Sequence, residues 1–308
     1  MMTKHKRQHF IPQSYLSSWL DPNTPENYEP YVWIVNKRNQ TVSKRAPKNI
    51  FYERDLYTIK DSSGNRDLVL EHGLSQLEGM FVSLARNKIF NHSRLDNEDH
   101  FILAAFISAM NARTPARAEE SLPFWREALD KINAMSSWSE SATPEQLDHM
   151  KKVMMTPMDA SEPFITKKDI EEVIESPIPT LMPSEIAVGM ELLPKLDMLI
   201  IETSTKPGFI TSDNPCVWHD PEGYKRPFPF QGPALMYPSI EITLPISPSF
   251  MFLLNRMGNK GYLDLSRYGP LVDLQFVNTV NRRIVLRAKD LIIVNQNLIL
   301  WDWFYDRY

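Results

Sequence analysis

The 308-residue sequence predicts an α+β protein in which strands and helices are segregated along the chain. Three observations lead to this prediction. Aromatic and β-branched segments come early, apolar residues recur at helical spacing from Leu68, and short strand-like runs return from Met198. We expect an N-terminal short helix and β-hairpin, a helical middle, and a C-terminal antiparallel or mixed sheet with a late helix. Residues 1–308 would form a single α+β domain, with a helical subregion at about 66–196.

The composition is typical of a folded soluble protein, with 43% hydrophobic and 23% charged residues. A single cysteine, Cys216, excludes an intrachain disulfide and fits a reducing compartment. No apolar stretch follows the lysine-rich start, and no window reaches the roughly 18 apolar residues of a membrane span. We therefore expect a cytoplasmic protein without a membrane partner. The net charge of −4 argues against a bulk polyanion binder, although local basic regions would still allow phosphate contacts.

The N-terminal segment from His9 to Leu16 is rich in large side chains and follows the cationic residues 4–7. Pro12 suits the start of a short helix, because its missing N–H would be unpaired there in any case. Tyr15 and Trp19 lie one turn apart and would share a face that docks on the body. The β-branched and aromatic residues 31–35 and the segment 40–43 flank a turn and predict the hairpin.

The helical middle begins at Leu68 with an apolar stripe of Leu70, Leu74, Leu77, Phe81 and Leu84. A second helix begins at Asp96, where Asp99 three residues later resembles a capping box. Pro115 ends or kinks this helix near Arg113. Further helices are predicted over residues 122–135, 144–155, 169–174 and 184–193, the last capped by Ser184.

The C-terminal part predicts strands over residues 198–202, 209–211, 240–246, 250–254 and 291–294, and a helix over 271–286. The segment from His219 to Ser239 contains five prolines. A loop of this length in a compact domain is typically a lid or binding loop, and its aromatic residues favour an ordered lid. The aromatic tail of residues 301–305 is expected to dock on the body.

Two candidate catalytic residues lie in the N-terminal half. The imidazole of His9 can act as acid, base or metal ligand, and the neighbouring cations would attract an anionic ligand. Alternatively, His9 only caps the first helical turn. Glu78 borders the apolar stripe, and a half-buried carboxylate needs a cation, a metal or hydrogen-bond donors. Its alternative role is a structural pair with an arginine.

Arg113 is such an arginine, because it continues the apolar face of its helix and therefore points toward the core. Arg117 follows one turn later if the helix continues past Pro115. Inward arginines hold carboxylates or phosphates, so Arg113 either pairs with Glu78 or clamps a substrate phosphate. Asp213 follows a strand in the segment 211–215, a common place for metal ligands and general bases. The same residues also suit a turn with local side-chain hydrogen bonds.

Asn278 and Arg282 share the polar face of the late helix. Between Arg256 and Lys289 there are seven Lys or Arg residues against two Asp residues. Such a face could contact phosphates, or it could simply be solvated. The sequence lacks the glycine-rich motifs of P-loop and dinucleotide-binding proteins, the H-E-x-x-H metalloprotease motif and the G-x-S-x-G hydrolase motif. Their absence argues against P-loop nucleotide hydrolysis and nicotinamide chemistry.

The segment from His9 to Leu16, preceded by Lys and Arg, resembles the opening of the bacterial family known as domain of unknown function 4238. Further matching pieces follow in order: residues 31–37, Asn49, Tyr57, residues 74–78, 113–115 and 209–215. The resemblance covers about residues 4–290. It implies a bacterial cytosolic protein whose defining residues are His9, Pro12, Tyr15, Glu78, Arg113 and Asp213. Many members begin with two adjacent histidines, whereas this chain has Gln8 at the first position.

Two functional hypotheses follow. The first is a hydrolase acting on a phosphodiester or nucleotide, such as a nuclease or nucleotide hydrolase of a toxin or phage-defence type. His9 would be the general acid or base, while Glu78 and Asp213 would position a water or a divalent metal such as Mg²⁺ or Mn²⁺. The predicted substrate-binding residues are Arg113, Arg117, Asn278, Arg282 and Tyr15. Nucleic acid or a nucleotide would be the partner.

The second hypothesis is a non-catalytic sensor or binding module. In that case His9, Glu78, Arg113 and Asp213 form a buried ion network that stabilises the fold. The long loop from His219 to Ser239 is then the working surface, because functional residues are often carried by loops on a rigid scaffold.

Overall fold

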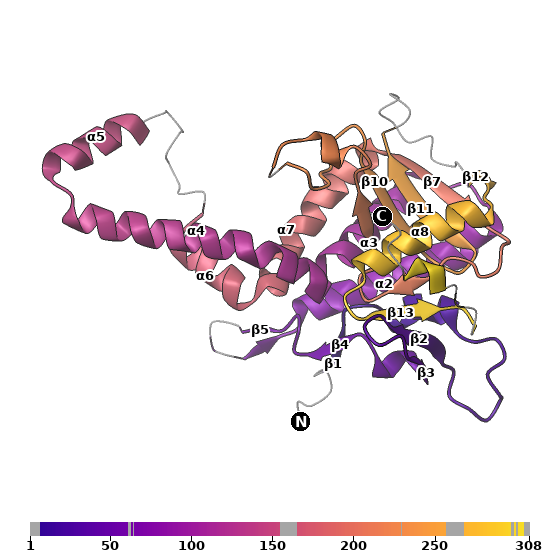
Figure 1. The fold of residues 1–308 in the computed structure, drawn as a ribbon. Coiled ribbons are helices and arrows are strands. Elements are labelled where there is room, and N and C mark those ends of the chain that lie inside the picture. Colours follow the sequence, from indigo (N-terminus) through magenta and orange to yellow (C-terminus); the bar gives the residue numbers. More distant parts are fainter. Residues whose placement is uncertain are drawn as a thin grey trace.

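The computed structural model describes residues 7–60, 63, 65–154, 165–228, 230–256, 268–296, 299 and 301–304. Figure 1 shows strands at both ends of the chain gathered in one body, with helices from the middle of the chain between and beside them. The α+β prediction is confirmed. Helices α2 to α7 occupy residues 69–192, within the predicted helical subregion of 66–196.

The N-terminal segment is held in the body by strand pairing and by two buried rings. Strand β1 (Arg7–His9) pairs antiparallel with β4 (Tyr52–Arg54), which the sequence did not predict. Helix α1 (Gln13–Leu16) follows Pro12 and continues as a 3₁₀ turn, η1 (Ser17–Trp19). The indole of Trp19 is fully buried and donates a hydrogen bond to the Phe209 carbonyl at 3.0 Å. The N-terminus is therefore anchored on the C-terminal half of the chain.

The predicted hairpin is present as β2 (Val32–Asn36) and β3 (Val42–Arg45). It belongs to a four-stranded antiparallel sheet with the order β3-β2-β13-β8. The two further strands are β8 (Thr211–Ser212) and β13 (Leu291–Val294). Segments from the beginning, the middle and the end of the chain thus share one sheet.

A second sheet has five strands in the order β12-β7-β11-β10-β9. In sheet order these are β12 (Tyr268–Leu271), β7 (Asp197–Glu202), β11 (Phe250–Asn255), β10 (Glu241–Pro245) and β9 (Val217–His219). Only β12 and β7 run parallel, so the sheet is mixed, as predicted. Strands β5 (Ile59–Lys60) and β6 (Arg66–Asp67) form a separate short pair.

The late helix α8 (Leu274–Arg287) begins three residues after its predicted start, because Asp273 caps it by accepting a hydrogen bond from the Phe276 N–H. Its buried face packs on the body, and the docked tail lies against it. Trp303 of the 3₁₀ turn η6 (Trp301–Trp303) is buried and donates to the Asn278 side chain at 2.9 Å. The predicted docking of the tail is confirmed for Trp303, while Tyr305 lies outside the described residues.

Helices α2 (Val69–Asn87) and α3 (Asn97–Ala112) form the centre of the helical region, and the rings of Phe81 and Phe106 stack between them at 3.6 Å. The predicted capping box of Asp96 and Asp99 is present. Helix α3 ends at Ala112, and Pro115 begins α4 (Pro115–Ser141). With α5 (Pro144–Met154) and α6 (Lys167–Glu175), α4 forms an arm that projects from the body (Figure 1).

Helices α4 and α7 each begin seven residues before their predicted starts. Helix α4 starts at Pro115 instead of Leu122 and contains Pro123 in its interior. Helix α7 (Pro177–Leu192) starts at Pro177, so Ser184 does not cap it but donates its hydroxyl to the Leu181 carbonyl. Pro115 and Pro177 begin these helices because proline is well tolerated at the first helical position, although the same residues also suit a break in a helix. The last residue of the predicted helix over 144–155 lies outside the described residues, as do residues 156–164.

Within the described part of the chain, every helix is either too short or too polar to cross a membrane.

Candidate functional site

Arg113 is the centre of a closed cluster in the core. It follows α3, and its side chain is only 3% exposed. Its Nη1 donates to Glu78 Oε1 at 2.7 Å, its Nη2 to the His9 carbonyl at 2.7 Å, and its Nε to the Tyr57 hydroxyl at 3.1 Å. The predicted pair of Arg113 and Glu78 is therefore formed, and each guanidinium nitrogen of Arg113 has an acceptor.

His9 joins this cluster through its backbone, while its ring makes other contacts. The ring Nε2 lies 3.3 Å from the Lys48 carbonyl, and Nδ1 lies 3.4 Å from the Gln13 amide. These partners match a neutral imidazole with the proton on Nε2. Burial lowers the pKa of His9, and the nearby charges of Arg113 and Arg7 act in the same direction. Both effects favour the uncharged ring. Through the His9 carbonyl, the cluster connects the main chain of β1 to α2 and α3.

Asp213 has a different set of partners. Its Oδ1 accepts from the Lys289 N–H at 2.8 Å, and its Oδ2 accepts from the N–H groups of Asp290 and Leu291 at 2.7 and 2.8 Å. Burial raises the pKa of Asp213, while the three backbone donors oppose this effect. The carboxylate fixes the junction between α8 and β13. Among the described residues, no contact of Asp213 is shared with the Arg113 cluster.

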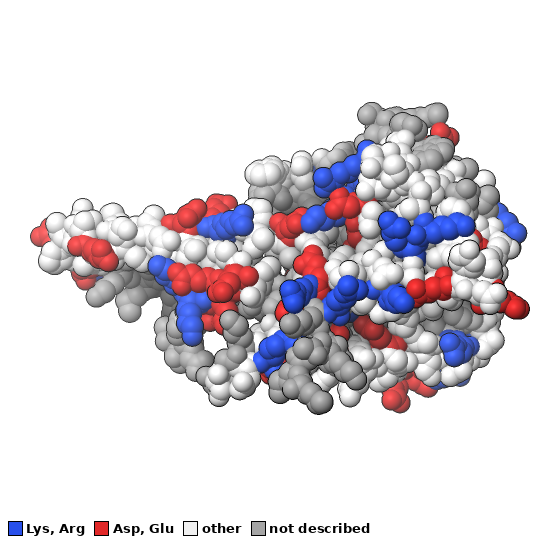
Figure 2. All heavy atoms as spheres, turned by 90° about the horizontal axis from the view of Figure 1, so that it is seen from below, with Lys and Arg blue, Asp and Glu red and all other residues white. Residues whose placement is uncertain are grey.

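Of the predicted site residues on α1 and α8, Tyr15 and Asn278 have defined partners. The hydroxyl of Tyr15 is buried between Thr211 Oγ1 and the Pro245 carbonyl, at 2.7 Å from each, and its burial raises the pKa of Tyr15. Asn278 accepts from Trp303, and Arg282 is exposed on α8. On the face seen in Figure 2, basic and acidic side chains lie beside one another over the body and the arm.

The described residues contain no group of three or more His, Cys, Asp or Glu side chains arranged to hold a metal ion. Glu78 pairs with a guanidinium, and both oxygens of Asp213 accept backbone N–H groups. The Mg²⁺ or Mn²⁺ site at Asp213 and Glu78 stays a prediction without support from these contacts.

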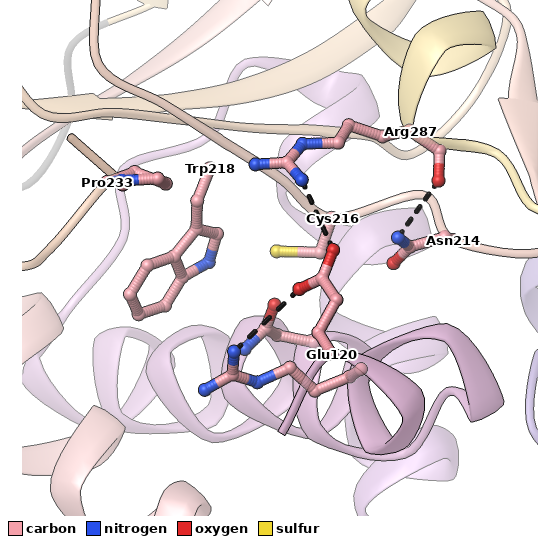
Figure 3. A pocket seen from close by; sticks show the side chains of 9 residues that line it. Glu120, Asn214, Cys216, Trp218, Pro233 and Arg287 are labelled. Carbon is pink, nitrogen blue, oxygen red and sulfur yellow. Dashed lines mark hydrogen bonds and ion pairs between the residues drawn. The ribbon is translucent and has the colours of Figure 1, made fainter. Parts of the chain in front are cut away.

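A polar cavity of about 300 Å³ lies elsewhere, between the first turns of α4, the end of α8, the segment before and within β9, and the long loop after it (Figure 3). We call it the Arg117–Arg287 pocket. Its lining residues are Asn111, Arg117, Glu120, Asn214, Cys216, Trp218, Gly232, Pro233 and Arg287. An adjoining cavity of about 210 Å³ shares Asn111, Arg117 and Trp218 with it and adds side chains from α3, α7 and the long loop.

Two arginines from different helices share one carboxylate in this pocket. Arg287 Nη1 lies 3.2 Å from Glu120 Oε1, and Arg117 Nη1 lies 3.9 Å from Glu120 Oε2 (Figure 3). Arg117 also reaches Glu185 at 3.2 Å. Its Nε is buried and lacks a hydrogen-bond partner within the part of the chain that the structure describes. One buried N–H donor of Arg117 is therefore without an acceptor from the described residues.

Two sequence motifs position these arginines. Thr114 of the Arg-Thr-Pro motif caps α4 by accepting from the Arg117 N–H at 3.3 Å. Asn214 of the Thr-Ser-Asp-Asn-Pro motif donates to the Arg287 carbonyl at 3.1 Å, next to the junction that Asp213 fixes. The sequence predicted Arg117 as a substrate-binding residue but missed Arg287, Asn111 and Trp218. Arg287 resembled any basic residue in a last helical turn, so only its packing against α4 marks it.

The family described as protein of unknown function (DUF4238) matches residues 7–297. The chain belongs to this family. The match confirms the resemblance that the N-terminal, Arg-Thr-Pro and Thr-Ser-Asp-Asn-Pro segments suggested. No curated protein and no solved structure matches the chain. Membership in DUF4238 implies no activity, so the function has to be argued from the contacts of the site.

In this DUF4238 member, the long loop over the pocket has internal contacts that keep it in place. Arg226 forms an ion pair with the buried carboxylate of Asp220 and stacks on the Tyr237 ring at 3.7 Å. Asp220 also accepts from the Ser239 hydroxyl at 2.7 Å. These contacts agree with the predicted order of the loop, although Tyr224 and Phe228 are exposed instead of packed.

Proposed function

We propose that this protein binds a phosphate-bearing small ligand in the Arg117–Arg287 pocket. The observation that carries the proposal is the sharing of Glu120 by two guanidinium groups, one of which has a buried Nε with no hydrogen-bond partner among the described residues. Arginine binds carboxylate and phosphate through the same planar arrangement of donors. The Glu120 carboxylate therefore occupies the place that a ligand phosphate would take.

A nucleotide is the form of ligand that fits the surroundings of the two arginines. The adjoining cavity is lined by the Trp218 ring and by the apolar side chains of Val188 and Leu235, which suit a planar base. Asn111 offers a polar group to the edge of a base, while Glu185 pairs with Arg117. Together the two cavities reach the lower part of the range of about 300–1,000 Å³ that is usual for small-molecule sites.

This proposal develops the hypothesis of a binding module, because the long loop contributes Gly232, Pro233 and Leu235 to the two cavities. The hydrolase hypothesis, with a nuclease or nucleotide hydrolase of a toxin or phage-defence type, is a second proposal. The structural partners of Glu78, Asp213 and the His9 carbonyl weigh against it. We also propose that the protein is cytoplasmic.

The binding proposal can be tested by calorimetric titration with inorganic phosphate and with nucleoside monophosphates. Arg287→Gln should weaken binding of both ligands by about 10-fold or more, because it removes a charged hydrogen-bond donor. Glu120→Gln should strengthen binding, because it removes the anion that competes for the arginines.

Glu119→Gln is the matched control, because the neighbouring Glu119 pairs with Lys289 and does not line the pocket. Its affinity should equal that of the unmodified protein. Equal effects of the two glutamate substitutions, or unchanged binding in Arg287→Gln, would overturn the proposal.

The hydrolase proposal calls for incubation with RNA, DNA and nucleotides, with and without Mg²⁺ or Mn²⁺. Turnover that disappears in His9→Ala and in Asp213→Asn, with folding retained, would support it. Absence of turnover, or turnover that survives both substitutions, would contradict it.

A further inference from the structure

A second hollow lies beside strands β2 and β3 of the four-stranded sheet, and we call it the Trp33 groove. It is an open groove of about 890 Å³ between the segment 21–31 and strands β2 and β3. Its lining residues are Asp21, Asn23, Pro25, Tyr28, Glu29, Tyr31, Trp33, Lys44, Arg45, Ala46 and Asn49. None of them lines the Arg117–Arg287 pocket, so the groove is a separate surface.

The aromatic wall of the groove is held in a fixed arrangement. Tyr31 and Trp33 are two residues apart in extended chain and therefore point to the same side. Their ring centroids lie 6.1 Å apart at 82°. The Trp33 indole donates to Asp21 Oδ2 at 2.7 Å, and the buried Asp21 also accepts from the Asn23 N–H at 2.9 Å. Tyr28 adds a ring that is 68% exposed.

Two cations line the same groove. Lys44 is the cross-strand neighbour of Trp33, and its Nζ lies 4.5 Å from the ring centroids of both Tyr31 and Trp33. Among the described residues, neither Lys44 nor Arg45 forms an ion pair with a carboxylate. The nearby Lys48, in contrast, pairs with Glu29 at 2.6 Å. Lys44 and Arg45 are therefore available to an anionic ligand.

The charge of the surrounding segment also favours an anion. Residues 1–60 carry ten Lys and Arg residues against five Asp and Glu residues, whereas the remaining chain carries 24 against 33. The overall net charge of −4 hides this asymmetry. A basic region within an acidic chain attracts polyanions locally and repels them elsewhere.

We propose that the Trp33 groove binds single-stranded nucleic acid. Bases stack on Tyr28, Tyr31 and Trp33, and phosphates contact Lys44 and Arg45. Sequence-tolerant binding of single strands combines such aromatic platforms with a cationic groove. In the free protein the Lys44 ammonium covers the ring faces; on binding, a base takes its place and the ammonium turns to a phosphate. A duplex cannot bind in this way, because its base faces are already stacked on one another.

The experiment is a fluorescence anisotropy titration with labelled single-stranded DNA and RNA, and with a duplex of the same sequence. Single strands should bind at least 10-fold more tightly than the duplex. Contacts of two cations with phosphates predict a slope of about −1.4 in a plot of log affinity against log salt. Tyr28→Ala and Lys44→Gln should each weaken single-strand binding about 5-fold or more.

Two exposed residues elsewhere serve as matched controls. Tyr224 is a tyrosine of similar exposure in the long loop, and Lys131 is an exposed lysine on α4. Tyr224→Ala and Lys131→Gln should leave binding unchanged. Arg287→Gln should also leave it unchanged, so this test is independent of the phosphate pocket.

Three outcomes would overturn the proposal. The first is no binding of single strands, the second is equal binding of duplex and single strand, and the third is equal losses in groove and control variants. Binding of a proline-rich peptide in place of the oligonucleotides would assign the aromatic groove to a different partner and overturn it as well.

Discussion

Arg113 and Arg117 lie four residues apart, yet their surroundings give them opposite roles. Arg113 is buried, and each of its guanidinium nitrogens has an acceptor from Glu78, His9 or Tyr57. Arg117 shares Glu120 with Arg287 and keeps a buried Nε without a partner among the described residues. An arginine therefore indicates a structural role when acceptors match its donors, and a candidate ligand site when a buried donor has no acceptor.

The break between α3 and α4 separates these two environments. Helix α3 ends before Arg113, Thr114 has an extended backbone, and Pro115 starts a new helix. Arg113 therefore stays in the core beneath β1, whereas Arg117 faces the end of α8. A continuous helix would have placed both arginines on the same buried face.

The largest expected effect concerns the closed cluster. Arg113→Ala should lower the free energy of unfolding by about 3–5 kcal/mol, because it breaks a buried ion pair and removes the donors to the His9 carbonyl and Tyr57. Urea unfolding measures this loss. Glu78→Gln should cost less, because the amide keeps an acceptor and the Glu78 side chain is partly exposed. A loss below about 1 kcal/mol for Arg113→Ala would show that the cluster does not stabilise the fold as proposed.

A smaller effect is expected at the α8–β13 junction. Asp213→Ala leaves three backbone N–H groups without their acceptor and should cost about 1–3 kcal/mol. It should also weaken phosphate binding, because the same junction positions Arg287. Asp290→Ala is the control, since Asp290 makes a surface pair with Arg38 worth about 0–1 kcal/mol. Unchanged stability and phosphate affinity in Asp213→Ala would remove the link between this motif and the pocket.

The sharpest test of the comparison is Arg287→Gln, which should change the free energy of unfolding by only about 0.5 kcal/mol. Its pair with Glu120 is about half exposed, and such pairs contribute little to stability. The same substitution should nevertheless weaken phosphate binding. Urea or thermal unfolding measures the change in stability, and the phosphate titration measures the change in affinity. A loss of stability as large as that of Arg113→Ala would show that Arg287, like Arg113, mainly stabilises the fold.

The smallest effect is a pH dependence assigned to His9. Burial lowers the pKa of His9 below its usual 6.5, so the folded protein binds this proton less readily than the unfolded chain. The contribution of His9 to stability is therefore present above pH 6.5 and is lost as the pH falls through the folded pKa. His9→Asn should flatten the stability curve in this acidic range, as followed by urea unfolding.

The pKa of His219 is also lowered by burial. Because His219 is present in both the unmodified protein and His9→Asn, the difference between their stability curves reports His9 alone. Parallel curves would show that the ring of His9 is not perturbed by folding.

Features with local causes were predictable from the sequence. The capping box of Asp96 and Asp99 started α3 as predicted, and the hairpin, late helix and docked tail followed from their apolar patterns. The pairing of Arg113 with Glu78 was also predictable, because both residues extend apolar helical faces. The start of α7 was not, because Pro177 and Pro183 suit either a loop or a helix until neighbouring helices pack against them.

The sequence by itself thus determined the α+β class, the family and the ion pair between the buried Arg113 and Glu78. Only the tertiary structure decided that Arg117 meets Arg287 around Glu120, and that Asp213 fixes a backbone junction instead of joining His9. Local patterns depend on neighbouring residues, and a single chain reveals them directly. Contacts between distant segments depend on how helices and sheets pack. The balance of donors and acceptors that distinguishes a candidate ligand site from a structural ion pair therefore appears only in the fold.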